Sequence, residues 1–268
     1  MGGEPLLIIG ETLNTSIKTV EEAVIARDDS LVARLAKEQV EAGADMLDVN
    51  AGIGMRDEYA DLIWLVSTTQ RAVDVPLVLD SSDPEVLVAA FSECRQRPML
   101  SSISCEPHKL EVLLPFIAEH DCSVLGLCIG EGGIPATAGE ILEVARLLID
   151  KTAQAGLKPQ DLYLDTAVTA VAADATSGQK AVAAIQLIKE YQPKVNTVCA
   201  VSNVSFGLPR RKLLNRTFIP MLASAGVDAL IIDARDKDTM ACILTTEALL
   251  GKDEYCINYV QAYRGGRL

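Results

Sequence analysis

Histidine, aromatic residues and basic side chains are all scarce in this sequence. Of 268 residues, 2 are histidine and 4% are aromatic, and 24 Lys and Arg against 37 Asp and Glu give a net charge of −13. A surface this acidic argues against nucleic acid and anionic membranes as partners. Both histidines, His108 and His120, fall on one expected helix, which argues against a Ser-His or Cys-His mechanism and against a zinc site.

Paired cysteine motifs, nucleotide-binding motifs and long apolar runs are absent. The seven cysteines form no CxxC pair, and several lie inside apolar runs, which is typical of reduced thiols in a cytoplasmic protein. No GxGxxG or GxxxxGKS pattern occurs, so the common phosphate-binding loops are not expected. No apolar run approaches the length of a membrane span, and the first residues, MGGEPLLIIGE, do not look like a signal peptide.

Short apolar segments alternate with helical segments along most of the chain. In residues 30–42, for example, Val32, Ala36 and Val40 recur at helical spacing before Gly43. Eight such alternations predict an α/β protein with the (β/α)8 TIM barrel fold, as a single domain over residues 1–268. The alternative, an open doubly wound sheet, usually carries the glycine-rich fingerprint that is missing here. The expected strands are 6–10, 46–50, 76–80, 99–104, 123–129, 161–165, 197–203 and 229–233, and the expected helices are 30–42, 58–73, 84–94, 107–119, 138–155, 177–191, 209–225, 236–250 and 254–264.

Polar side chains lie at the ends of these expected strands. The C-terminal ends of barrel strands meet at one open mouth, where barrel enzymes carry out their chemistry. A mouth rich in carboxylates and amides but poor in cations is unsuited to a phosphate. Carboxylates accept paired N–H bonds and an Asn amide both donates and accepts, so these groups suit a neutral heterocycle with several N–H donors. The candidate binding residues are Glu11, Asn14, Asp48, Asn50, Asp80, Ser101, Asp165, Asn203 and Asp233.

Other interpretations of these residues stay open on the sequence alone. A single strand-end Asp or Asn more often caps the next helix or binds loop amides. Asp80, Asp165 and Asn203 together favour a binding site, whereas Asp48 and Asp233 are evenly balanced. Several carboxylates could also bind Mg²⁺, but no spacing demands it, and we predict no metal site.

Six motifs resemble those of the pterin-binding methyltransferases. GETLN, LDVNAG, LVLDSS, LYLD, AVSNVS and LLNRTF occur in that family's order and spacing, and SNVSFGLPRRKLLNRTF is the most specific stretch. The family includes methyltetrahydrofolate:corrinoid protein methyltransferases and the folate domain of cobalamin-dependent methionine synthase. The resemblance implies a pterin-binding barrel, with tetrahydrofolate or 5-methyltetrahydrofolate as ligand. It also implies a homodimer and a corrinoid, with its cobalt, carried by a partner protein that docks at the barrel mouth.

The resemblance further implies roles for individual residues. In the family, Asp residues of the third and sixth strands bind the N–H edge of the pterin, and they match Asp80 and Asp165. The seventh-strand Asn hydrogen-bonds near N5, the atom that exchanges the methyl group, and it matches Asn203. These three are therefore the expected catalytic residues. Arg211 matches an Arg on the following loop, although the run PRRK could equally be a solvated helix start.

The implied reaction is methyl transfer between a corrinoid and N5 of tetrahydrofolate. Its direction stays open, but the family's stand-alone enzyme has Asn where this chain has Ser101, which favours the demethylation branch that forms methyltetrahydrofolate. Because no histidine ends a strand, we expect the N5 proton to pass through ordered water. Two alternatives remain. One is a dihydropteroate synthase-like enzyme, which needs a cation where this chain has Asn203, and the other is a non-catalytic folate-binding subunit.

Overall fold

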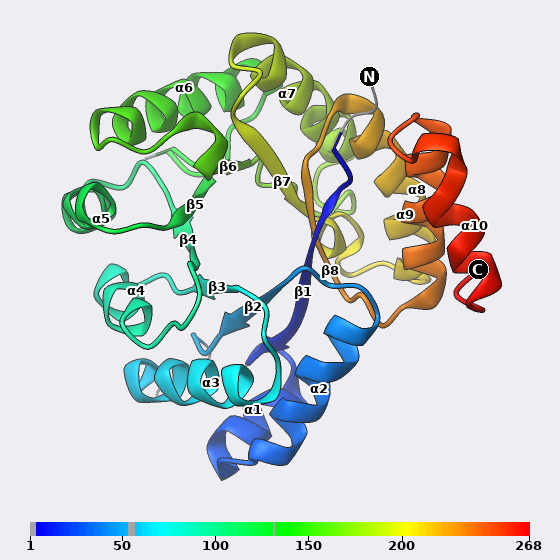
Figure 1. Ribbon diagram of the computed structural model, residues 1–268. Helices are drawn as coiled ribbons and strands as arrows, with labels where there is room; N and C mark the ends of the chain where they lie inside the picture. The colour runs from blue at the N-terminus through cyan, green and yellow to red at the C-terminus, as the bar shows by residue number, and fades with distance from the viewer. Residues whose placement is uncertain (1–3, 53–56, 131) are drawn as a thin grey trace.

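The strands form one closed barrel in the computed structural model, which describes residues 4–52, 57–130 and 132–268 (Figure 1). Each strand pairs in parallel with the next, and β1 pairs with β8 to close the ring. The predicted (β/α)8 barrel is therefore confirmed. The strands are β1 (Leu7–Asn14), β2 (Met46–Asn50), β3 (Leu77–Asp80), β4 (Met99–Ile103), β5 (Ser123–Leu127), β6 (Leu162–Asp165), β7 (Asn196–Ala200) and β8 (Ala229–Ile232).

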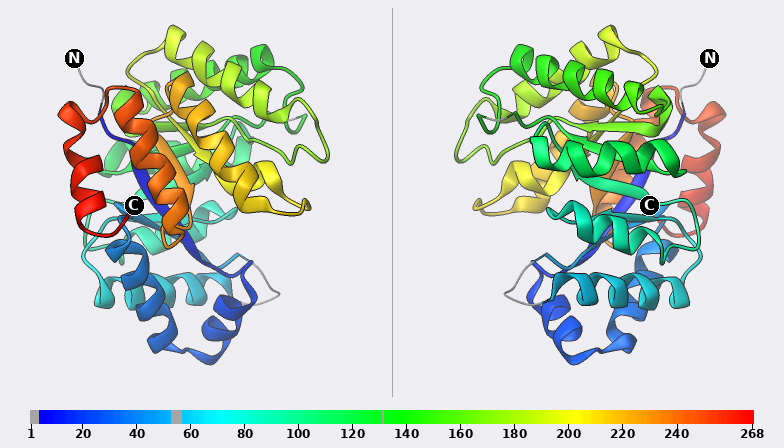
Figure 2. Two further views of the ribbon diagram at one scale, coloured as in Figure 1. Left: turned by 90° about the vertical axis from the view of Figure 1, so that its right-hand side faces the viewer. Right: turned by 90° about the vertical axis from the view of Figure 1, so that its left-hand side faces the viewer.

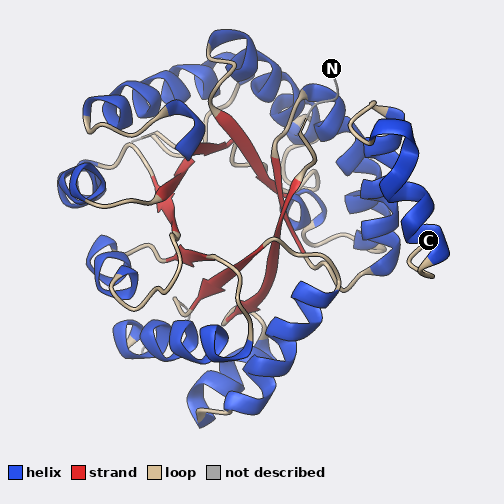
Figure 3. Cartoon of the chain, viewed as in Figure 1, coloured by secondary structure: helices blue, strands red, loops and turns tan. Residues whose placement is uncertain are grey.

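Helices surround the ring of strands on its outside (Figure 3). Aspartate residues that precede some of them accept the first backbone N–H groups, as Asp28 does from Ser30 and Leu31 at the start of α2. The helices are α1 (Lys18–Ala26), α2 (Asp29–Glu41), α3 (Glu58–Ala72), α4 (Pro84–Phe91), α5 (Pro107–Glu119), α6 (Ala138–Gln154), α7 (Ser177–Tyr191), α8 (Arg211–Ala225), α9 (Lys237–Leu249) and α10 (Ile257–Arg264), with short 3₁₀ turns η1 (Pro159–Asp161), η2 (Val201–Ser205) and η3 (Glu254–Cys256).

The core of the barrel has two parts, because each strand points alternate side chains inward and outward. The outer part lies between the strands and the surrounding helices and is the larger. The inner part is a small apolar cluster inside the ring, to which seven strands contribute one buried residue each: Ile9, Met46, Val78, Met99, Leu125, Val198 and Ala229. The next inward position on each strand lies two residues further towards the mouth.

The predicted strands agree with the observed ones except near two mouth segments. The strand predicted over 197–203 ends at Ala200, and Asn203 lies in the turn η2. The prediction was wrong because apolar composition cannot separate a strand from a 3₁₀ turn that continues it. The strand predicted over 6–10 extends to Asn14, since Leu13 and Asn14 still pair with β2. Glu11 and Asn14 are therefore inside β1 rather than beyond it.

Two helical segments also differ from the sequence prediction. Helix α1 was not predicted, because a (β/α)8 pattern leads one to expect a single helix between β1 and β2. The C-terminal helix predicted over 254–264 is interrupted, since Tyr255 and Cys256 have left-handed backbone angles, and α10 begins only at Ile257. Helix α10 packs on the outside of α9 (Figure 2). No helix among the described residues is long and apolar enough to cross a membrane.

Candidate functional site

A layer of polar side chains lies directly above the inner apolar cluster. Two residues beyond Ile9, Met46, Val78 and Met99 stand Glu11, Asp48, Asp80 and Ser101, and the same step on β6 leads from Tyr163 to Asp165. A cavity of about 780 Å³ opens at this level. Eight of the predicted site residues line it: Glu11, Asn14, Asp48, Asp80, Ser101, Asn203, Arg211 and Asp233.

Asn50 and Asp165, the two remaining strand-end candidates, adjoin the cavity without lining it. The side-chain amide of Asn50 donates to Asp80 Oδ2 at 2.8 Å, so it fixes a carboxylate that does line the cavity. Asp165 is 5% exposed, and its Oδ1 accepts from the backbone N–H of Ala167 at 2.8 Å. The interpretation that strand-end acids bind loop amides is thus correct for Asp165, which accepts from the Ala167 N–H and also from the Ala200 N–H.

Burial changes the acid–base behaviour of two of these carboxyls. Loss of solvation raises the pKa of Asp165 to about 6, although hydrogen bonds from the Ala167 and Ala200 N–H groups act to lower it. Loss of solvation, together with the nearby charges of Asp80 and Glu11, raises the pKa of Asp48 well above its usual range. The raised pKa favours the protonated form of Asp48, which can donate a hydrogen bond as well as accept one.

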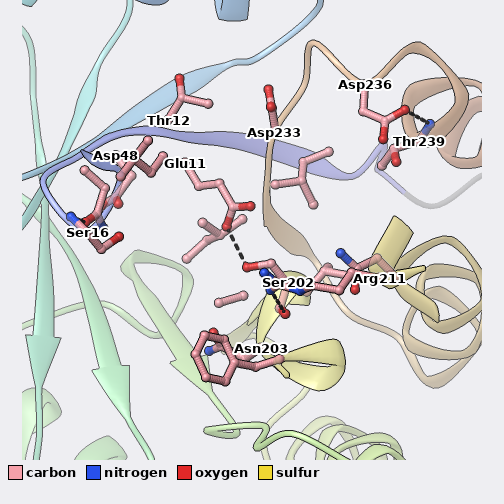
Figure 4. Close-up of a pocket in the computed structure, with 18 of the residues that line it drawn as sticks. Glu11, Thr12, Ser16, Asp48, Ser202, Asn203, Arg211, Asp233, Asp236 and Thr239 are labelled. Atoms are coloured by element: carbon pink, nitrogen blue, oxygen red, sulfur yellow. Dashed lines mark hydrogen bonds between the residues drawn. The ribbon is translucent and has the colours of Figure 1, made fainter. Parts of the chain in front are cut away.

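Glu11 lies in the cavity at an irregularity of β1. Between Gly10 and Leu13 the pairing with β2 shifts by one residue, the mark of a β-bulge, which turns a side chain away from its regular direction. Figure 4 shows the Glu11 carboxylate pointing across the cavity to Ser202, whose hydroxyl donates to Glu11 Oε2 at 3.1 Å. Burial raises the pKa of Glu11 to about 7, with the hydrogen bond from Ser202 acting in the opposite direction.

Asp233 differs from these groups because it is held in its charged form. Arg235 donates to both carboxylate oxygens at 2.9 Å, and Gln39 Nε2 donates to Oδ1 at 2.8 Å. Burial alone would raise the pKa of Asp233, but the hydrogen bonds and charge of Arg235 lower it below its ordinary value. The mouth therefore combines an ionised carboxylate on β8 with carboxyls whose pKa values are raised by burial.

The turn η2 and the start of α8 form another side of the cavity. Asn203 is exposed on this turn, and Arg211 Nη2 donates to the Ser202 carbonyl at 2.7 Å. The guanidinium of Arg211 also lies 5.6 Å from the ring centre of Phe206. Through these contacts Arg211 holds the turn in place beside the cavity (Figure 4).

Two functional candidates were missed in the sequence. Gln39 is fully buried, and besides Asp233 it donates to Thr12 Oγ1 at 2.9 Å and accepts from the Ala234 N–H. The sequence does mark Gln39, because it is a polar residue among the apolar positions that recur at helical spacing in α2. Asn215 lines the cavity, and its buried Oδ1 has no hydrogen-bond partner among the residues that the structure describes. Asn215 lies in the LLNRTF motif, but no role was assigned to it, because its position relative to the cavity depends on where α8 packs.

Metal binding has little support at this mouth. Within residues 4–52, 57–130 and 132–268, no group of three or more His, Cys, Asp or Glu side chains is arranged to hold a metal ion. The histidines lie elsewhere, on α5 and at its C-terminal end.

Comparison with known sequences identifies a family. The family model described as "Pterin binding enzyme" matches residues 10–233. The chain is 34% identical over 265 residues to the methylcorrinoid:tetrahydrofolate methyltransferase of Eubacterium limosum, which covers 98% of each chain. It is also 31% identical over 242 residues to the methionine synthase of Mycobacterium tuberculosis, which covers 85% of this chain but only 20% of that protein.

Solved structures of dihydropteroate synthases share the fold. The enzyme from Yersinia pestis superposes with a TM-score of 0.69 at 16% identity, covering 91% of this chain and 93% of the other. The enzyme from Xanthomonas albilineans, in complex with 7,8-dihydropteroate, gives a TM-score of 0.64 at 20% identity, with 91% and 94% covered. At such low identities the likeness concerns the barrel alone.

Proposed function

The chain belongs to the pterin-binding enzyme family, and on this basis we propose that it is a methyltransferase acting between a corrinoid and N5 of tetrahydrofolate. The observation that carries the proposal is the 34% identity with a methylcorrinoid:tetrahydrofolate methyltransferase over 98% of both chains. The match extends over almost the whole of both chains, so it includes the strands that form the barrel and its mouth. The corrinoid is too large for the cavity and would be presented by a partner protein docked at the barrel mouth.

In this proposal the polar layer of the mouth binds the pterin. Asp80 and Asp165 accept hydrogen bonds from the N–H edge of the ring, as a pair of carboxylates suits a heterocycle with adjacent donors. Asn203 hydrogen-bonds near N5 and acts in the transfer step. The other walls of the folate site are formed by Glu11, Asn14, Asp48, Ser101, Arg211 and Asp233, and Asn50 supports the site through its hydrogen bond to Asp80.

The proposed direction of transfer is from the methylcorrinoid to tetrahydrofolate. The name of the E. limosum relative gives this direction for that protein. Ser101 on β4 is consistent with it, since it replaces the Asn expected for the stand-alone enzyme of the opposite branch. The product would be 5-methyltetrahydrofolate.

A direct assay tests the proposal. The protein is mixed with free methylcobalamin and tetrahydrofolate, and the absorption spectrum of the cobalt centre is followed together with the appearance of methyltetrahydrofolate. Methyl transfer in either direction supports the proposal. Stoichiometric folate binding without any turnover, with free methylcobinamide and with a candidate corrinoid protein, would instead indicate a non-catalytic folate-binding subunit.

The dihydropteroate synthase-like alternative has less support. Such an enzyme needs a cation near the pterin and a basic anchor for the pyrophosphate leaving group. The seventh strand leads to Asn203, and the cation that follows β8, Arg235, is already bound to Asp233 and Glu38. The solved synthases share the barrel with this chain at only 16–20% identity. This similarity is evidence for the fold and not for the reaction.

Location, assembly and domain structure complete the proposal. All seven cysteines lie in the described part of the chain and none forms a disulfide, which suits the cytoplasm.

Leu249, Tyr255 and Tyr263 are more than two-thirds exposed near the C-terminal end, and this apolar surface suits a homodimer. We also propose that residues 1–268 form one domain, since α10 packs on α9 of the barrel. Sedimentation analysis tests the dimer.

A further inference from the structure

Glu11 occupies an unusual position for a charged side chain. It lies on the inward face of β1, two residues above the fully buried Ile9, and it lines the cavity with Asn203. The pairing of β1 with β2 is irregular at this point, and the Glu11 carboxylate points across the mouth towards the turn η2 (Figure 4). Its hydrogen-bond partner there is Ser202, the residue directly before Asn203. Glu11 and the amide assigned to N5 therefore face the same part of the cavity.

The groups around Glu11 do not fix its charge. Asp48 on β2 and Asp233 on β8 are acidic neighbours, and Arg211 on α8 is the basic group that acts on it from a distance. Among the described residues, no basic side chain forms an ion pair with Glu11, whereas Asp233 has Arg235 and Asp236 has Lys212 and Arg216. Glu11 is thus a carboxyl that can gain or lose a proton without breaking an ion pair.

We propose that Glu11 is the proton-exchanging group for N5 of the folate. This inference rests on the proposed function. In the direction towards tetrahydrofolate, the N5 lone pair attacks the methyl carbon, the cobalt–carbon bond breaks, and its electron pair stays on the cobalt. N5 then has four bonds and a positive charge, and its proton passes to the Glu11 carboxylate. In the reverse direction Glu11 returns this proton, which makes N5 a better leaving group.

The other carboxyls of the mouth are less suited to this role. Asp233 is kept ionised by Arg235 and Gln39. Asp48 is 6% exposed, and burial raises its pKa well above the usual range, which disfavours the ionised form that would accept a proton. Asp165 already accepts from a loop N–H and is assigned to the N–H edge of the pterin. Burial brings the pKa of Glu11 to about 7, where both its forms are available.

The substitution Glu11→Gln tests the proposal, because it keeps the shape and the hydrogen bond to Ser202 but cannot take up a proton. Single-turnover transfer from free methylcobalamin to tetrahydrofolate is followed from about pH 5.5 to about pH 8.5. In the natural protein the rate should rise with pH through an inflection near 7 and then level off, since the ionised form accepts the proton. In Glu11→Gln the inflection should vanish and the plateau rate should fall by about 10²–10⁴-fold.

Two more variants separate proton exchange from a structural role. Ser202→Ala removes a hydrogen bond that favours ionised Glu11, so the inflection should move to higher pH while folate affinity by calorimetry changes little. Glu22→Gln, at an exposed carboxylate of α1, is the matched control and should leave the profile unchanged. An infrared difference titration of the folate-free proteins gives a readout without turnover, in which a carboxyl titrating near pH 7 should be missing from Glu11→Gln.

The outcomes distinguish this inference from the proposed function. No transfer in either direction by the natural protein would remove the proposed function and with it this role. Transfer by the natural protein with an unchanged rate and inflection in Glu11→Gln would overturn the role of Glu11 alone. Parallel losses of folate affinity and rate in Glu11→Gln, with the inflection retained, would also overturn it, because they indicate a binding residue.

Discussion

Replacing Glu11 by Gln should stabilise the folded protein more at alkaline pH than at acidic pH. The quantity compared is the gain in the free energy of unfolding of the variant over the natural protein. Below its ordinary pKa of 4.5, Glu11 is protonated in both the folded and the unfolded state, and its ionisation contributes nothing to the free energy of unfolding. Between 4.5 and about 7 the unfolded chain releases the proton while the folded protein keeps it, so stability falls as pH rises. Above about 7 the full penalty for the buried charge is present.

The size of this effect follows from the two pKa values. The difference between 4.5 and about 7 corresponds to a penalty of about 3 kcal/mol at pH 8.5, against less than about 1 kcal/mol at pH 5. The Gln amide adds its own contribution, but this is the same at both pH values because an amide does not titrate. The gain in stability of Glu11→Gln should therefore be about 2–3 kcal/mol larger at pH 8.5 than at pH 5.

Urea denaturation of both proteins at the two pH values measures this difference directly. The exposed control Glu22→Gln should show no comparable dependence on pH, since its carboxylate is solvated in both states. If Glu11→Gln changed the free energy of unfolding by the same amount at pH 5 and pH 8.5, then burial would not perturb this carboxyl, and the reasoning that links its position to its pKa would be refuted.

Three further predictions concern the folate site and its support. Asp165→Asn should weaken tetrahydrofolate binding by about 10- to 100-fold, because the new amide presents a donor to the donor edge of the pterin; unchanged affinity by calorimetry would remove Asp165 from the site. Asn203→Ala should lower the transfer rate more than it lowers folate affinity, and equal losses would argue against a role in the transition state. Gly10→Ala should lower the free energy of unfolding by about 1–3 kcal/mol, because its Cβ would meet Gln39 Oε1 at 2.8 Å and Leu47 Cδ2 at 2.9 Å; an unchanged urea midpoint would contradict this.

Much of the barrel could be predicted from the order of apolar and polar residues. A parallel strand buried on both faces has a continuous apolar sequence, so segments such as Leu77–Asp80 and Leu162–Asp165 were recognised with boundaries close to those observed. The ends of parallel strands meet at one rim, so the polar residues that follow them were expected to gather there. Seven of them line one cavity, although those of the first and seventh strands were assigned to the wrong kind of segment.

Only the tertiary structure decided how these polar groups differ from one another. Composition treats Glu11, Asp48 and Asp233 alike, yet the pKa of Glu11 is raised to about 7, that of Asp48 is raised well above its usual range and that of Asp233 is lowered. The reason is that the pKa of a carboxyl depends on its solvent and its neighbours, and these come from distant parts of the chain. Gln39, 194 residues before Asp233, and Ser202, 191 residues after Glu11, reach their partners only when the barrel closes.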